Sequence, residues 1–167
     1  GRSVDPAALR ALTDRRPGAI ANWIQGAELY RKSQFVAAIT YFRRAVDADS
    51  ALALAALRGA EAADWLDGPT EAREFLTLAE AHLSLLPPKY ATFATGLGHY
   101  FAGRADSALV HLRRALAADS GFTAAWMTVG EVFFHLLPQE ASAPDSAARA
   151  AFLATRRTDP GFAPPLY

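Results

Sequence analysis

RRAVDADS at residues 43–50 recurs as RRALAADS at residues 113–120, and this recurrence decides the fold. The two stretches lie 70 residues apart, which is close to two periods of about 34 residues. The same offset carries Gly26 onto Gly96. Repetition at such a period is typical of arrays of small helical units that stack on one another and share a core.

Four copies align when the units begin at residues 19, 53, 89 and 123. One shared column holds small residues, Gly26, Ala60, Gly96 and Gly130. A second column holds Ala38, Ala72, Ala108 and Ala148, and a third holds Phe42, Leu76, Leu112 and Phe152. The alignment needs extra residues only near Pro87 and in the loop 138–143, where proline ends helices and insertions cost little.

Each unit is predicted to form two helices. Apolar residues at Phe35, Ala38, Ile39 and Phe42 follow the 3.6-residue period of an amphipathic helix. Glycine inside a helix costs about 1 kcal/mol relative to alanine, so the glycine column indicates close crossing of two helices. The sequence therefore predicts an all-α fold, an α-solenoid of about four helix-turn-helix units, with an extra N-terminal helix that begins at Asp5.

The predicted organisation follows this register. It comprises an N-terminal extension and helix (residues 1–18), unit 1 (19–52), a degenerate unit 2 (53–88), unit 3 (89–122), unit 4 with a loop insertion (123–162), and the start of a truncated further unit (163–167). The chain begins at Gly1 without a methionine and ends at Tyr167 without a closing element. We therefore expect it to be part of a longer protein.

The run WMTVGEVF at residues 126–133 resembles the first-helix signature of the tetratricopeptide repeat (TPR), W-x2-L-G-x2-Y. Ala148, Phe152 and the Asp159-Pro160 step resemble the second-helix and exit signature of the same family. More loosely, residues 130–135 and 159–164 resemble TPR regions attached to bacterial serine/threonine kinases and transcriptional regulators. The family resemblance implies protein binding, and the looser one implies a signalling context in bacteria.

Composition excludes several classes of protein. With 51% hydrophobic and 20% charged residues the chain is too apolar to be disordered. Seventeen basic residues balance seventeen acidic ones, so no net charge attracts nucleic acid or an anionic membrane. No apolar run approaches the roughly 20 residues of a spanning helix, so we expect no membrane contact by this segment. We expect a cytoplasmic location, with an extracytoplasmic sensor segment as the alternative, and the oligomeric state stays open.

No group of residues in the sequence predicts catalysis. Cysteine is absent, which excludes disulfides, cysteine-ligated zinc and thiol nucleophiles. The histidines, His82, His99, His111 and His135, form no H-E-x-x-H motif. The Gly96-Leu97-Gly98 run lacks the third glycine and the downstream acid of a dinucleotide loop. We therefore predict no catalytic residue, no metal site, no cofactor and no enzymatic activity.

Two histidines and the paired arginines receive structural interpretations. His99 occupies a column where a core aromatic is expected, and His135 is a candidate for the binding face. The arginine pairs that begin at Arg15, Arg43, Arg113 and Arg156 are expected to solvate an outer face rather than to follow a phosphate backbone.

The TPR resemblance implies that the first helix of each unit lines a concave inner face. Carried over by register, the predicted concave-face binding residues are Trp23, Tyr30, Arg31, Trp65, Phe93, Tyr100, Phe101, Met127, Phe134 and His135. Glu61, Asp64 and Glu131 fall among the polar positions of the same face. An aromatic inner wall would anchor apolar side chains of a peptide, unless the chain itself covers that wall.

These features favour a scaffold that binds an unknown peptide or protein partner on its concave face, as a regulatory segment of a bacterial signalling protein. A small-molecule-sensing domain and a passive architectural spacer are the alternatives. A clamp for peptide C-termini is not expected, since Arg31 is the only cation among the predicted inner-face positions apart from His135.

Overall fold

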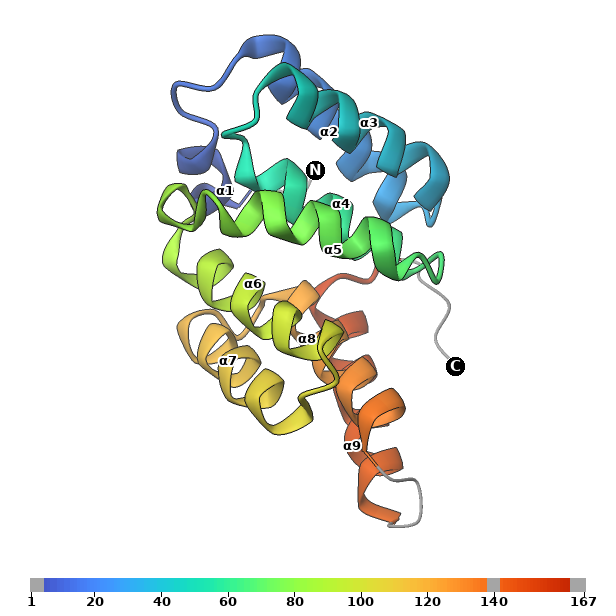
Figure 1. Cartoon of the computed structure of the whole chain (residues 1–167). Coiled ribbons are helices and arrows are strands. Elements are labelled where there is room, and N and C mark those ends of the chain that lie inside the picture. The colour runs from blue at the N-terminus through green and yellow to red at the C-terminus, as the bar shows by residue number, and fades with distance from the viewer. Residues whose placement is uncertain (1–4, 138–141, 163–167) are drawn as a thin grey trace. The chain divides into compact units, whose positions relative to one another are not determined.

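The computed structural model describes residues 5–137 and 142–162, and the chain divides into two compact units, residues 1–91 and 92–167. The predicted all-α fold is confirmed, because every regular element of the described residues is helical and consecutive helices pack in pairs (Figure 1). The predicted loop insertion at residues 138–143 lies largely outside the described residues, and so does the predicted further unit at 163–167.

The first compact unit contains five α-helices, a short 3₁₀ turn and the first turn of the sixth helix. These elements are α1 (Pro6–Ala11), α2 (Pro17–Arg31), α3 (Phe35–Ala48), α4 (Ala53–Asp64), α5 (Pro69–Glu80), the 3₁₀ turn (Leu83–Leu85) and the start of α6 (Pro88–Phe101). Helix α2 pairs with α3, α4 pairs with α5, and α3 also packs on α4. Helix α1 is the N-terminal helix predicted to begin at Asp5, whose carboxylate accepts a hydrogen bond of 2.9 Å from the Ala7 N–H.

The second compact unit contains the remainder of α6 and the elements that follow it. These are α7 (Ala105–Ala118), α8 (Thr123–Glu131), a π-helical turn (Val132–Leu136) and α9 (Ser142–Thr158). Helix α8 packs on both α7 and α9. The helix pairs begin at Pro17, Ala53, Pro88 and Thr123, whereas the predicted units begin at residues 19, 53, 89 and 123.

Proline residues begin several helices, and residues with a left-handed backbone conformation (positive φ) lie in the turns between helices. Proline occupies the first turn of α1, α2 and α5, where its missing N–H costs nothing. The turns inside the first three helix pairs each contain a residue with positive φ, namely Ser33 at 57°, Asp67 at 54° and Gly103 at 71°. Ser33 and Asp67 are 34 positions apart, and Asp67 and Gly103 are 36 positions apart. The backbone conformation of the turns therefore recurs with nearly the same period as the sequence.

Every helix pair crosses at a glycine that faces a large side chain of the second helix. A Cβ atom added to Gly26 would lie 2.7 Å from the ring of Phe42, and one added to Gly96 would lie 3.1 Å from Leu112. In the fourth pair a Cβ on Gly130 would lie 2.2 Å from the ring of Phe152. The close approach predicted for the small-residue column is therefore present in these three pairs.

In the second pair the crossing residue differs from the aligned one. The glycine is Gly59 rather than Ala60, because a Cβ on Gly59 would lie 2.5 Å from the ring of Phe75. Phe75 thus replaces Leu76 as the side chain that fills the crossing. Gly59 and Phe75 are 16 residues apart, as are Gly26 and Phe42. At this crossing the second pair is therefore offset by one residue from the alignment, which had placed Ala60 and Leu76 there.

Candidate functional site

The predicted inner-face residues fall into three groups by exposure. Trp23, Tyr30, Phe93 and Met127 are buried. Trp65, Tyr100, Phe101 and Phe134 are half-buried, and Arg31 and His135 are exposed. Phe93 is fully enclosed and packs edge-to-face on Phe122 with ring centroids 5.2 Å apart. Phe93 is therefore a core side chain, and the half-buried and exposed residues are the ones that a partner could touch.

Three aromatic rings of the first unit form one cluster at the end of α4. The Phe35 ring stacks on the Trp65 ring at 5.5 Å and 6°, and it meets the Tyr30 ring edge-on at 5.5 Å. The indole Nε1 of Trp65 donates a hydrogen bond of 3.2 Å to the Tyr30 hydroxyl. Stacking and hydrogen bonding hold these rings in one arrangement. Tyr30 and Trp65 were predicted site residues, whereas Phe35 had been expected only as part of the core stripe.

An ion pair between half-buried Arg58 and buried Glu61 lies on α4 before this cluster. Nη1 of Arg58 donates to both carboxylate oxygens of Glu61, at 3.0 and 2.9 Å. Glu61 is only 7% exposed, and burial raises the pKa of its carboxyl even though Arg58 opposes the shift. Burial also raises the pKa of the Tyr30 hydroxyl, and the Glu61 charge adds to that shift. Glu61 thus depends on Arg58 to stay ionised at this depth.

Asp64, in the last turn of α4, has no such compensation. Burial, together with the charges of Glu61 and Asp67, raises the pKa of its carboxyl to about 6. Among the described residues its carboxylate has neither a hydrogen-bond donor nor an ion-pair partner. The negative end of the α4 dipole lies at the same place. The end of α4 is therefore a site of uncompensated negative charge beside aromatic rings.

The buried indole of Trp23 lies on the helix face of α2 that also carries Tyr30. Seven residues separate the two, which is close to two turns of helix. Trp23 is 9% exposed, and within the described residues its Nε1–H has no acceptor. A buried donor without an acceptor costs about 1–3 kcal/mol. This face of α2 therefore has a donor that nothing in the described fold satisfies.

The N-terminal segment is tied to the start of α6. The Tyr90 hydroxyl donates a hydrogen bond of 2.7 Å to Asp5, and the Lys89 ammonium lies 2.6 Å from the same carboxylate. Burial would raise the pKa of Asp5, but the hydrogen bonds from Lys89, Tyr90 and Ala7 lower it on balance. The same carboxylate caps α1, so Asp5 joins α1 to α6 within the first unit.

Two histidines of the second unit stack on each other. The His99 and His111 rings lie 5.2 Å apart at 20°, and the Arg104 Nε–H donates to His99 Nδ1 at 3.0 Å. His99 therefore pairs with a histidine on α7 and is half-exposed, where a core aromatic had been expected. Burial, His99 and Arg114 all lower the pKa of His111.

Acidification is expected to destabilise the second unit through His111. Its pKa in the folded chain lies below the ordinary histidine value of 6.5, so the folded chain binds fewer protons than the unfolded chain. Stability is full above that value and falls as the pH drops through it. His111→Gln should remove this loss of stability on acidification, so the stability difference between the two proteins is expected to change between roughly pH 8 and pH 5 when urea denaturation is measured at each pH. A stability difference between the two proteins that does not vary with pH would contradict this expectation.

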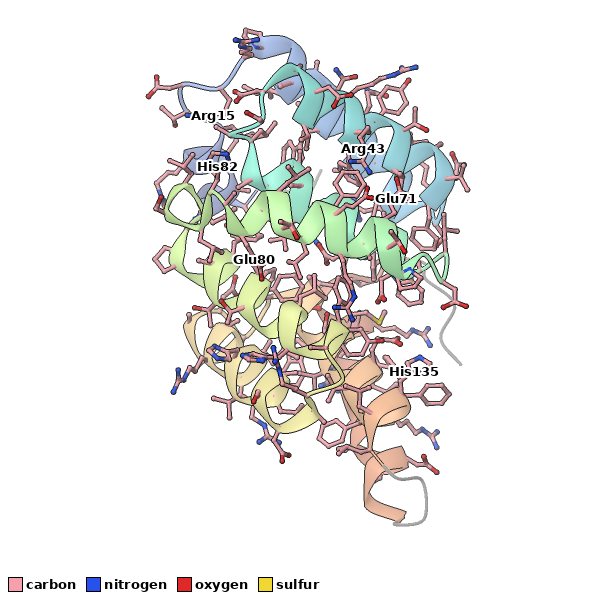
Figure 2. All side chains as sticks on the ribbon, in the orientation of Figure 1. Arg15, Arg43, Glu71, Glu80, His82 and His135 are labelled. Carbon is pink, nitrogen blue, oxygen red and sulfur yellow. The ribbon has the colours of Figure 1, made fainter. Side chains whose placement is uncertain are left out.

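One of the paired arginines joins two helices instead of solvating an outer face. The Arg43 guanidinium of α3 lies 4.0 Å from the centroid of the Phe75 ring and 3.0 Å from the Glu71 carboxylate of α5 (Figure 2). Arg43 therefore fastens α3 to the second helix pair. On the second unit, Nε2 of exposed His135 lies 3.0 Å from the carboxylate of Glu131 one turn earlier.

The described side chains form no group of three or more histidine or acidic residues that could hold a metal ion. Within the same residues, no helix combines the length and apolarity needed to cross a bilayer. No protein-family model matches the chain, and no curated protein matches its sequence. The arrangement that remains is a set of half-buried aromatic rings at or just after the C-terminal ends of first helices, Trp65, Tyr100, Phe101 and Phe134. Aromatic side chains are frequent contacts at protein interfaces, so these rings suit the binding of a polypeptide.

Proposed function

We propose that the chain is a protein-interaction scaffold whose first helices, α2, α4, α6 and α8, together with their C-terminal ends, bind a peptide or protein partner. The observation that supports this most directly is the set of half-buried aromatic rings at the ends of these helices, Trp65, Tyr100, Phe101 and Phe134. Tyrosine, tryptophan and arginine supply most of the binding energy at protein interfaces, and Arg31 lies at the end of α2.

The geometry of these rings favours binding over mere packing. Tyr100 and Phe101 are tilted against each other with centroids 5.8 Å apart, and Phe134 meets His135 edge-on at 4.8 Å. Rings held by neighbours lose little side-chain entropy on binding, so more of the contact energy appears as affinity. By resemblance to TPR regions of signalling proteins, we place the scaffold in a regulatory segment of a bacterial signalling protein in the cytoplasm. We assign it no enzymatic activity.

A peptide selection tests this function. Peptides enriched on the whole chain from a random phage library are expected to bind Tyr100→Ala at least about tenfold more weakly, because truncating a hot-spot ring costs 2 kcal/mol or more. Affinity is measured by fluorescence anisotropy, with circular dichroism to check that the helices persist.

The matched control is Val36→Ala, which truncates an exposed apolar side chain on the second helix α3. Its affinity is expected to stay within about twofold of the wild type. If wild type and Tyr100→Ala bound the selected peptides with equal affinity, Tyr100 would not belong to the binding face. Failure to enrich any peptide would favour a passive spacer.

A further inference from the structure

We infer that four side chains of the α6–α7 pair, His99, Arg104, His111 and Arg114, bind a phosphate monoester dianion. They lie on α6, on α7 and in the turn between the two helices. This inference goes beyond the scaffold function and does not depend on it. It is supported by the contacts that gather these donors, by the charges around them, and by a difference between the two copies of the repeated sequence.

The helix crossing at Gly96 brings the two histidines together. A Cβ atom added to Gly96 would lie 3.3 Å from the Cβ of His111, so α7 passes close to α6 at this point. His99 lies three residues further along α6, and its ring stacks on the His111 ring with centroids 5.2 Å apart. Two imidazole rings, each with an N–H donor, therefore lie side by side.

The turn between the helices adds the guanidinium of Arg104. Its backbone N–H donates to the His99 carbonyl at 2.9 Å, and its Nε–H donates to His99 Nδ1 at 3.0 Å. Because Nδ1 accepts this bond, the N–H of the neutral His99 ring is at Nε2, where it can donate to a further acceptor. Elsewhere among the described residues the Arg104 guanidinium has no partner, so its Nη–H donors remain available to an anion.

The charges that act on His111 are positive. Burial lowers the pKa of its ring, and the charges of His99 and Arg114 lower it further. Asp106 is the only acidic residue of α6 and α7, and it lies five residues before His111, about 140° away around the helix. In the described part of the chain neither Arg104 nor Arg114 forms an ion pair. A bound anion would therefore supply the negative charge that this group of donors lacks.

The two copies of the repeated sequence differ in the partners of their arginines. In the first copy, RRAVDADS, Arg43 lies 3.0 Å from the Glu71 carboxylate. In the second copy, RRALAADS, the equivalent Arg113 and its neighbour Arg114 have no ion pair within the described residues. Ala117 also stands where the first copy has an aspartate. The second copy thus keeps the arginine pair without acidic partners, as expected of arginines that contact an anion from outside the chain.

A phosphate monoester suits these donors better than a carboxylate or a metal ion does. At neutral pH it carries a charge of about −1.5 to −2 and three strong acceptor oxygens, so it accepts from guanidinium and imidazole groups at once. A carboxylate carries a single charge. A metal ion would be repelled by the arginines, and the described side chains form no group of three or more histidine or acidic residues that could hold one. The phosphate belongs either to a small ester or to a phosphorylated side chain of a protein.

The test is a titration of the whole chain, followed by nuclear magnetic resonance of the histidine rings. Methyl phosphate, the acetylated and amidated tripeptide Ala-phosphoserine-Ala, and acetate are added separately near neutral pH at constant ionic strength. Both phosphate probes are expected to shift the ring resonances of His99 and His111 saturably and to leave those of His82 and His135 nearly unchanged. The pKa of His111 is expected to rise on binding, because the dianion stabilises the imidazolium. Acetate is expected to bind at least about tenfold more weakly.

The two phosphate probes distinguish the sources of the ligand. Tighter binding of the tripeptide than of methyl phosphate would assign the site to a phosphorylated protein. Equal binding of the two would assign it to a small phosphate ester.

Matched variants in the two sequence copies test the residues. Arg104→Gln and Arg114→Gln are each expected to weaken methyl phosphate about fivefold or more, because each removes a charged donor. Arg44→Gln removes the exposed arginine that is equivalent to Arg114 in the first copy, and its affinity is expected to stay within about twofold of the wild type. Thermal melts of each variant separate lost binding from lost folding.

Three results would overturn the anion site. The first is a set of ring shifts no larger at His99 and His111 than at His82. The second is equal binding of acetate and methyl phosphate, and the third is equal affinity of the Arg114→Gln and Arg44→Gln variants. Each of them leaves the scaffold function standing, because the peptide selection and Tyr100→Ala test that function without phosphate.

Discussion

Gly59→Val is expected to lower the free energy of unfolding of the first unit by about 3 kcal/mol. A Cβ at Gly59 would lie 2.5 Å from two atoms of the Phe75 ring and 2.8 Å from its Cγ. Phe75 is completely buried, and contact at Cγ leaves its ring no rotation that would relieve the clash. The helices α4 and α5 must therefore move apart. Urea denaturation followed by far-ultraviolet circular dichroism measures the loss.

Gly18→Val is the matched control, since Gly18 also lies in a helix but has no atom within 4 Å of its added Cβ. Its effect is expected to stay within about 0.5 kcal/mol. If Gly59→Val were as stable as Gly18→Val, the close crossing at Gly59 would be wrong, and Ala60 would return as the residue equivalent to Gly26.

Arg58→Met is expected to cost about 3 kcal/mol at neutral pH, because it leaves the buried Glu61 carboxylate without its partner. The loss should shrink as the pH falls. Burial already raises the pKa of the Glu61 carboxyl above its ordinary value of 4.5 in the folded chain, and the pKa rises further without Arg58. As the pH falls, Glu61 is therefore protonated in the folded chain before it is protonated in the unfolded chain. Denaturation of wild type and variant at a series of pH values measures the convergence.

Two further variants isolate the cause of this loss. Arg10→Met removes an exposed arginine at the end of α1 and is expected to change stability by less than about 0.5 kcal/mol. The double variant Arg58→Met/Glu61→Leu removes both charges and is expected to recover most of the stability. A double variant as unstable as Arg58→Met alone would show that packing, and not the unpaired charge, causes the loss.

The fold was accessible from the sequence because its signals are local. The apolar stripe predicted from Phe35 to Phe42 is buried as expected along α3, since helix periodicity depends only on neighbouring residues. The N-terminal helix was likewise predicted from Asp5 and Pro6, which cap and begin α1. The crossing in the second pair was missed by one residue, because α4 is so rich in small residues that Gly59 and Ala60 align equally well.

The candidate site was only partly accessible, because exposure and charge balance depend on packing. The register selected Tyr30 and Trp65, but it could not show that Phe35 joins them or that Phe93 is fully enclosed. The lack of a partner for Asp64 is equally invisible in the sequence, where Glu61 lies three residues from both Arg58 and Asp64 along α4. Ring contacts and ion pairs between helices depend on helix crossings, which residue patterns predict poorly.

The scaffold function is tested most directly by mapping a bound peptide onto the chain. Backbone amide resonances are assigned by nuclear magnetic resonance, and a peptide selected on the whole chain is titrated in. Shift changes are expected to concentrate on the first helices and their C-terminal ends, at Trp65, Tyr100, Phe134 and their neighbours. Changes confined to the second helices α3, α5, α7 and α9 would contradict the account, because binding would then use the opposite members of the helix pairs.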